Sequence, residues 1–438
     1  MTHPSPRTHV RFEILAFLFA VTTINFADRA TLSMVGTDLA KALQLDPVAL
    51  GFAFSAFGWS YAAAQIPGGW LLDQFGSKRV YGLSLTVWSV LTLLQGFVGS
   101  ANATVAVILL FVLRFLLGVA EAPAFPGNSR IVAGWFPTAE RGTAAAIFNS
   151  AQYFATFAFA PIMGAIVHYF GWPEVFWFMG AAGLLLAFAW PRVIHAPLEH
   201  PRASAIEVEH VRRGGGLVEL DRSAGAASQA MAWSALGRLL RSRMLVGVYL
   251  AQYCINTLTW FFLTWFPAYL VKERGMSILK VGFVAMLPAL CGFIGGILGG
   301  VVSDALLRRG RSLTLARKTP IVAGLLLSTC IVVCNYVDTQ WAVILCMSLA
   351  FLGKGIGALG WAVISDTSPR EMTGLSGGLF NTFGNVAAIT TPIVIGYILR
   401  ETGSFNGALL FVGAHALLAV ACYVFIVGPI QRVELAPG

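Results

Sequence analysis

Charged residues stand inside apolar stretches of this sequence, and their types and spacing indicate chemistry that couples a proton to an anion. Arg114 and Glu121 lie seven residues apart in the apolar run 104–128, so an α-helix would place them on one face, about two turns apart. A charge at the centre of a bilayer costs roughly 2.5–3.5 kcal/mol, and such charges usually face the bundle interior and serve a function. We expect this pair to handle a proton and an anion together; the alternative is a buried ion pair that only joins two helices.

A second acid and cation are adjacent in the first apolar run, 13–36, as Asp28 and Arg29. Neighbouring side chains point about 100° apart on a helix, so both cannot avoid the interior of a bundle, and a polar cavity between helices is implied. The planar guanidinium of Arg29 suits a carboxylate, and we expect it to bind the anion. The alternative is that Arg29 only neutralises Asp28.

The composition indicates that these residues belong to a membrane protein. Of the 438 residues, 57% are hydrophobic and 11% are charged, whereas a soluble domain carries about 25% charged residues. A spanning length of about 20 apolar residues predicts an all-α membrane protein with twelve transmembrane helices. The predicted spans are 13–36, 49–72, 80–99, 104–128, 142–169, 172–193, 244–271, 279–306, 318–337, 340–364, 373–399 and 405–429.

A polar, arginine-rich segment divides the spans into two sets of six. We predict an N-terminal half (1–193), a flexible cytoplasmic linker (194–243) and a C-terminal half (244–438). With both termini inside the cell, Lys and Arg gather on the inner side, as the positive-inside rule requires. The net charge of +9 is thereby explained without nucleic acid as a partner.

An internal repeat supports two related halves. GGWLLDQFGSKRV (68–80) and GGVVSDALLRRGRS (299–312) both combine glycines, an Asp and basic residues after the second span of their half. We expect Asp73, Arg79 and Asp304 to form ion-pair latches that hold one conformation and open in another. A plain loop with orienting charges is the alternative.

Several of these blocks resemble a known family. The loop Gly69-x-Leu71-x-Asp73 with its basic end is similar to the signature loop of the major facilitator superfamily. NFADRATLS (25–33), RFLLGVAEAPAFPGNSRIVAGWFP (114–137), GKGIGALGWAVISDTSP (353–369) and GLSGGLFNTFGN (374–385) resemble the bacterial anion:cation symporter branch, and its D-glucarate/galactarate permeases most of all.

The resemblance implies two six-helix halves around a cavity that opens alternately to either side, and symport of a sugar-acid anion with protons. It gives Asp28 and Glu121 roles in proton coupling, and we expect Arg114 to tune Glu121 or to pair with Asp28. The residues implied to bind substrate are Arg29, Tyr61, Gln152, Trp361 and Asn381.

Lys354 is a further candidate, which the resemblance does not supply. It lies seven residues before Trp361 in the predicted span 340–364, about two turns away on the same helix face. Because a sugar diacid carries a carboxylate at each end, we expect Arg29 and Lys354 to hold the two ends. A lysine that extends to the membrane interface is the alternative.

We therefore predict a proton-coupled symporter, not an enzyme, that imports D-glucarate or galactarate as a monomer in a bacterial inner membrane. No cofactor or metal is expected, since zinc and nucleotide motifs are missing and the cysteines lie in apolar runs. Its partners are the sugar acid, protons and the lipid bilayer. A symporter of a monoanion such as galactonate or a hexuronate, a channel, and a nutrient sensor remain as alternatives.

Overall fold

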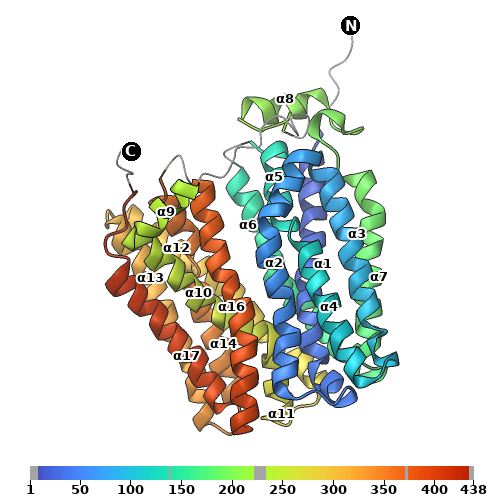
Figure 1. Cartoon of the computed structure of the whole chain (residues 1–438). Helices are drawn as coiled ribbons and strands as arrows, with labels where there is room; N and C mark the ends of the chain where they lie inside the picture. The colour runs from blue at the N-terminus through green and yellow to red at the C-terminus, as the bar shows by residue number, and fades with distance from the viewer. Residues whose placement is uncertain (1–7, 138–139, 221–232, 370–372, 434–438) are drawn as a thin grey trace. The chain divides into compact units, whose positions relative to one another are not determined.

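The computed structural model of the chain (Figure 1) describes residues 8–137, 140–220, 233–369 and 373–433. Every regular element in these ranges is helical, which confirms the predicted all-α fold class. Several predicted spans have nearly the predicted bounds, and α7 has the same ones, Trp172–Val193.

The helices divide as follows. The first eight are α1 (Val10–Ala42), α2 (Pro47–Phe75), α3 (Ser77–Gln95), α4 (Ala103–Glu121), α5 (Ala124–Trp135), α6 (Arg141–Tyr169), α7 (Trp172–Val193) and α8 (Ala205–Arg213). They are followed by α9 (Trp233–Arg241), α10 (Arg243–Thr264), α11 (Phe266–Lys272), α12 (Ile278–Arg308), α13 (Leu313–Ser328), α14 (Gln340–Ile356), α15 (Gly360–Thr367), α16 (Thr373–Thr402) and α17 (Asn406–Ala421). Shorter helical turns cover Val98–Ser100, Pro197–Glu199, Thr329–Tyr336 and Cys422–Ile426.

Eleven helical segments of the described residues are long and apolar enough to cross a membrane. α2 is not among them, although its 29 residues extend about 44 Å, which exceeds the hydrocarbon thickness of a bilayer. α2 therefore accounts for the twelfth predicted span by length.

Contacts along the chain divide it into two compact units, and each is described by itself. Unit 1 comprises Met1–Thr31, Trp59–Ala155 and Tyr169–Gln229, and unit 2 comprises Leu32–Gly58, Thr156–His168 and Ala230–Gly438. Within unit 2, α10 packs along α16 and α17, as Figure 1 also shows. The division at residues 193 and 244 stays a prediction.

Three predicted spans are interrupted where the sequence carries proline or glycine. α4 ends at Glu121 and α5 begins at Ala124, with Pro123 between them, because proline lacks the N–H that would continue the helix. α10 ends at Thr264, shortly before Pro267. α14 ends at Ile356 and α15 begins at Gly360, so the span predicted at 340–364 is not one continuous helix.

Glycines let three helices of unit 2 approach with their backbones in contact. A Cβ atom on Gly295 of α12 would collide with the carbonyl oxygen of Leu352 on α14. A Cβ atom on Gly353 of α14 would collide with the carbonyl oxygen of Gly324 on α13. Small residues at such crossings are the usual basis of close helix packing in membranes.

The segment predicted to be a flexible linker is folded where it is described. α8 begins after Ser204, whose hydroxyl accepts a hydrogen bond from the Glu207 backbone N–H at 3.2 Å. The fully buried Glu207 carboxylate accepts hydrogen bonds from the backbone N–H groups of Val10 and Arg11, both at 3.1 Å. A helix N-terminus has unpaired N–H groups and a positive partial charge, so this carboxylate caps α1. The expectation of a flexible linker is wrong for this part.

Replacement of Gly295 by Ala should destabilise the protein, because the new methyl group meets a backbone carbonyl that cannot rotate away. Overpacking of this kind typically costs about 1–3 kcal/mol. The matched control is Gly300→Ala on the same helix, where a Cβ atom meets nothing within 4 Å. We expect thermal unfolding in detergent to begin at a lower temperature for Gly295→Ala only; equal melting temperatures would refute the close packing.

Candidate functional site in unit 1

α1 carries Asp28 and Arg29 into the interior of unit 1. The two side chains are 1% and 8% exposed, so the adjacent acid and cation are both buried, as predicted. The helix tolerates polar residues on this stretch because the hydroxyls of Thr22 and Thr31 donate to carbonyl oxygens four residues earlier, at 2.7 and 3.1 Å. Their donors are therefore satisfied within α1 itself.

α4 presents its two charged residues on one buried stripe. Arg114 and Glu121 are 2% and 0% exposed, and the residues buried with them, Ala106, Leu110, Leu117 and Gly118, recur every three or four positions. This spacing is that of one helix face. The prediction that Arg114 and Glu121 share a buried face is confirmed.

The central contact of the site joins α1 to α4. The Arg29 Nε atom donates to the Glu121 Oε2 atom at 2.8 Å, and both side chains are buried. The rings of Phe26 and Tyr61 lie 4.9 and 4.6 Å from the guanidinium carbon of Arg29. Aromatic faces attract a desolvated cation, so Arg29 is held by one acid and two rings.

Asp28 completes a cluster of two acids and two cations in unit 1. Its charged neighbours are Glu121, Arg114 and Arg29. The Thr92 hydroxyl is the polar neighbour of the Asp28 carboxylate and the Asn25 amide is that of Glu121, but neither contact has full hydrogen-bond geometry. Buried polar atoms normally have partners. This arrangement can bind and release a proton and can accept an anion.

The two remaining substrate-binding candidates of unit 1 lie on other helices. Tyr61 of α2 is 4% exposed and contacts Arg29 through its ring. Gln152 lies on α6, half-buried, and its side-chain amide donates to the Asn149 carbonyl oxygen at 3.1 Å. Tyr61 is therefore part of the cluster, and the placement of Gln152 at substrate stays a prediction.

The candidates of unit 2 differ in their surroundings. Lys354 of α14 is 5% exposed, with its Nζ atom 5.2 Å from the centre of the Phe351 ring. Trp361 of α15 is 54% exposed, and its ring packs edge to face against the Phe380 ring with 4.9 Å between the ring centres. Since the helix is interrupted between them, the shared face predicted for Lys354 and Trp361 is wrong. The predicted pairing of Arg29 with Lys354 at two ends of a ligand stays a prediction, because these residues belong to different units.

α16 contributes the last predicted substrate residue. Asn381 is half-buried, and its carbonyl oxygen accepts a hydrogen bond from the Asn385 side chain at 3.0 Å. On α10, the neighbouring Gln252 and Asn256 are linked by a hydrogen bond of 3.4 Å. A Cβ atom on Gly384 of α16 would touch Asn256, so these amides pack against α16.

Comparison with known proteins gives this arrangement a family. The model of the Major Facilitator Superfamily matches residues 18–317. The chain belongs to the Major Facilitator Superfamily. It is thus a multi-pass membrane protein of a transporter superfamily, not an enzyme.

Individual relatives of this superfamily member cover nearly the whole chain. A probable galactarate/D-glucarate transporter of Bacillus subtilis (strain 168), GudP, is 60% identical over 99% of this chain and 96% of its own length. A D-galactonate transporter of Escherichia coli O6:H1 is 38% identical over 97% of both chains. The structure of a D-xylose–proton symporter has the same fold, with a TM-score of 0.76, 14% identity and coverage of 96% of this chain and 98% of that one.

Two of the residues predicted to form latches, Asp73 and Asp304, have basic partners that the sequence analysis did not identify. Asp73 pairs with Arg130 of α5, and Arg79 is exposed. Asp304 lies 3.9 Å from Arg317 of α13, which makes a closer pair with Asp366 of α15 at 2.8 Å. Arg130 could have been identified as a partner from the sequence, because it follows the end of a predicted span on the same side of the membrane as the loop that carries Asp73.

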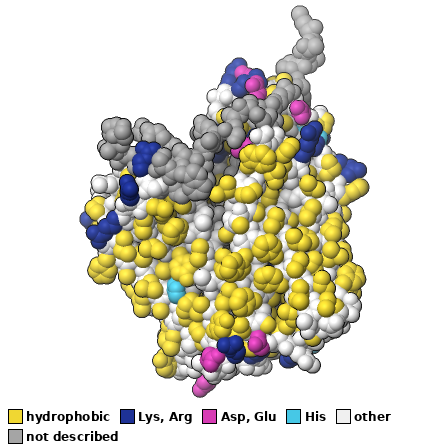
Figure 2. Space-filling view, in the orientation of Figure 1, with side chains coloured by type: hydrophobic (Ala, Val, Ile, Leu, Met, Phe, Trp, Pro, Cys, Tyr) yellow, Lys and Arg dark blue, Asp and Glu magenta, His cyan; other side chains and the backbone are white. Residues whose placement is uncertain are grey.

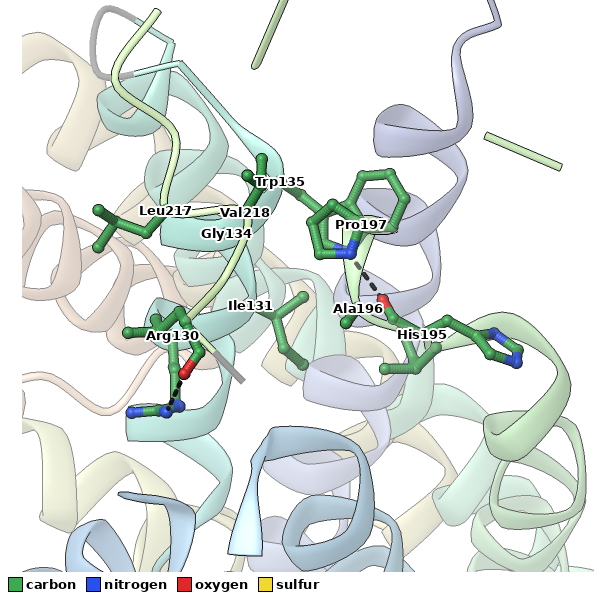
Figure 3. A pocket seen from close by; sticks show the side chains of 11 residues that line it. Arg130, Ile131, Gly134, Trp135, His195, Ala196, Pro197, Leu217 and Val218 are labelled. Atoms are coloured by element: carbon green, nitrogen blue, oxygen red, sulfur yellow. Dashed lines mark hydrogen bonds between the residues drawn. The ribbon is translucent and has the colours of Figure 1, made fainter. Parts of the chain in front are cut away.

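A separate small pocket lies between α5 and the segment 194–220 (Figure 3). Trp135 donates from its Nε1 atom to the His195 carbonyl oxygen at 3.0 Å beside it. Burial lowers the pKa of His195, and the charge of Lys78 lowers it further. None of the predicted site residues lines this pocket, and its cation, Arg130, already pairs with Asp73.

Metal binding has no candidate group in the described part of the chain. No set of three or more His, Cys, Asp or Glu side chains there could hold an ion.

Replacement of the two acids by amides should separate their structural contributions. Glu121→Gln leaves the buried Arg29 without its charged acceptor, and removal of one partner of a buried pair typically costs about 3–5 kcal/mol. Asp28→Asn removes a carboxylate that accepts no hydrogen bond from a described residue. We expect a clearly larger loss of thermal stability for Glu121→Gln; a larger loss for Asp28→Asn would contradict the assigned contacts.

Proposed function

We propose that this superfamily member imports a sugar-acid anion, D-glucarate or galactarate, together with protons. The observation that carries the proposal is the buried cluster of Asp28, Arg29, Arg114 and Glu121 in a chain 60% identical to a probable galactarate/D-glucarate transporter. Buried charges of this kind mark ion and proton pathways in membrane proteins. The protein works by alternating access as a monomer in a bacterial inner membrane.

The four charges have distinct proposed roles. Asp28 and Glu121 carry protons, Arg114 tunes Glu121, and Arg29 binds a substrate carboxylate. The Arg29–Glu121 ion pair of 2.8 Å supports a link between the two events. A proton on Glu121 removes the charge that holds Arg29, and the guanidinium then becomes available to the incoming anion.

Neutral groups provide the remaining contacts to the sugar acid. A polyhydroxylated ligand needs hydrogen-bond donors and acceptors around its charged anchor, and large side chains against its carbon skeleton. We assign these roles to Tyr61, Gln152, Trp361 and Asn381. Tyr61 has the strongest support, because its ring already contacts Arg29 at 4.6 Å.

The proposed orientation places both termini in the cytoplasm, with halves 1–193 and 244–438 joined by the segment 194–243. Lys and Arg then concentrate on the cytoplasmic side, as the positive-inside rule requires. On that side Asp73 with Arg130, and Asp304 with Arg317, are the proposed latches. Arg79, near Asp73 in the chain, is an exchange partner once the first latch opens.

The membrane potential sets the number of protons needed. Each negative charge that enters a cell held negative inside costs about 2.3 kcal/mol per 100 mV. Two protons cancel this cost for a dianion, and Asp28 and Glu121 offer two carboxyl groups. We therefore propose two protons per molecule of diacid.

Reconstitution into liposomes tests the transport itself. An inward proton gradient should drive accumulation of labelled D-glucarate, and either Asp28→Asn or Glu121→Gln should abolish this accumulation. Glu209→Gln, at a partly exposed residue of α8, is the matched control and should behave as the unaltered protein. Uptake that is unaffected by external pH and by a proton ionophore would refute the proposed coupling to protons.

Lys354→Met tests recognition of the second carboxylate of a diacid. We expect the preference for D-glucarate over a monocarboxylic sugar acid to fall by about tenfold, because one buried charge–charge contact is worth about 1.4 kcal/mol or more. Lys280→Met, at an exposed lysine, is the control. An unchanged preference in the Lys354 variant would show that this lysine does not read the second carboxylate.

A monoanionic sugar acid is the second candidate substrate, supported by the relative named as a D-galactonate transporter at 38% identity. The 60% identity to the galactarate/D-glucarate relative favours the diacid. Competition against labelled D-glucarate by D-galactonate and by a hexuronate separates the two, since only the true substrate class competes at low concentration.

A further inference from the structure

One end of unit 2 carries arginines that have no acidic partner in the described part of the chain. Arg238 and Arg241 lie in the last turn of α9, Arg243 begins α10, and Arg308, Arg309 and Arg311 follow one another around the end of α12. All six side chains are exposed. None of them forms an ion pair with an acid of the described residues, and we call this set the arginine rim.

A shared apolar cluster brings the parts of the arginine rim to the same end of unit 2. Leu239 of α9 is fully buried in a cluster with Leu245 and Tyr423, and Leu313 packs against that cluster. Leu239 lies between Arg238 and Arg241, and Leu313 follows Arg311 by two residues. α9 is therefore anchored to unit 2 through Leu239 and its contacts with α10, with its arginines on the exposed side.

The arginine rim lies where the spans leave the membrane. Arg243 is the first residue of one candidate span and Arg308 is the last residue of another. The neighbouring side chains of Leu240, Leu315 and Phe425 are 41, 43 and 72% exposed. Cations at the ends of spans beside exposed apolar side chains lie at the depth of lipid headgroups.

In unit 1, three comparable arginines form ion pairs with acidic side chains. Arg11, near the start of α1, lies 3.4 Å from Glu140 and 4.0 Å from Glu207. On α8, Arg212 lies 3.2 Å from Glu219, and Arg213 lies 2.8 Å from Glu209. In the view of Figure 2, basic side chains near α8 stand among acidic ones, whereas those near α9 stand without them. These three arginines of unit 1 have acidic partners, whereas none of the six in the arginine rim pairs with an acid of the described residues.

We propose that the arginine rim binds the phosphate headgroups of anionic phospholipids in the cytoplasmic leaflet, which fixes α9 against the membrane. Guanidinium groups suit phosphate oxygens, and clustered basic residues beside spans are attracted to anionic lipid. The exposed apolar neighbours favour a lipid over a soluble anion, because acyl chains can cover them. The cytoplasmic assignment rests on the orientation proposed above.

The test is thermal unfolding of the purified full-length protein in detergent, with phosphatidylglycerol or phosphatidylcholine of the same acyl chains added. Phosphatidylglycerol should raise the melting temperature and phosphatidylcholine should not. The double variant R238Q/R241Q should need on the order of tenfold more phosphatidylglycerol for the same shift. The matched control R212Q/R213Q, on the paired arginines of α8, should respond as the unaltered protein does.

Two further measurements test whether the shift comes from charge and whether it needs a lipid. In 1 M salt, where charges are screened beyond about 3 Å, the shift of the unaltered protein should disappear, and this arm needs no variant to fold. Inorganic phosphate alone should give no shift. The proposal is overturned if both lipids act alike, if R238Q/R241Q responds as the unaltered protein does, if the shift survives salt, or if phosphate or a soluble acidic protein reproduces it. No substrate is present, so the outcome is independent of the transport proposal.

Discussion

The ion pair between Arg29 and Glu121 is the interaction on which the rest of unit 1 depends. Both side chains are buried, and an unpaired charge in that position would be strongly unfavourable. The pair therefore fixes α1 against α4, and it brings Asp28 and Arg114 into the same small region. Tyr61 and Phe26 cover the guanidinium group, so water is excluded from much of the cation. A ligand or a proton that acts on one member of this cluster must change the energy of all of them.

Much of this could be predicted from the sequence, because a charge in an apolar run leaves few possibilities. Arg114 and Glu121 had to share a face at a spacing of seven residues, and they do, on one continuous helix. Burial of Asp28 and Arg29 followed from the same reasoning. What spacing could not supply was the partner: Arg29 pairs with Glu121, ninety-two residues away, and not with its neighbour Asp28. Pairing across helices depends on how the helices pack.

Two predictions from the sequence were wrong for local physical reasons. The helix between Lys354 and Trp361 stops at Ile356, within a run of glycines that favour a break, so a face argument across it fails. The linker was predicted to be flexible because it is polar, carries seven arginines and contains the run GGG at 214–216. Its described part is ordered by contacts distant in sequence. The buried Glu207 accepts from backbone N–H groups nearly two hundred residues earlier, and the Leu217 N–H donates to the Ala133 carbonyl oxygen. A hydrogen bond to a backbone group leaves no pattern in the sequence around either partner.

The Glu207 cap also has a consequence for biosynthesis. The carboxylate and the Val10 N–H group that it binds are 197 residues apart, which a ribosome takes about 10–40 s to add at about 5–20 residues per second. During this time α1 has entered the membrane with its leading amide groups hydrated and its first turn able to fray. The helix is completed only when α8 emerges, after α2 to α7. The earliest span to be made is thus among the last to reach its final hydrogen bonding, and a nascent chain stalled before residue 207 would hold α1 incompletely anchored.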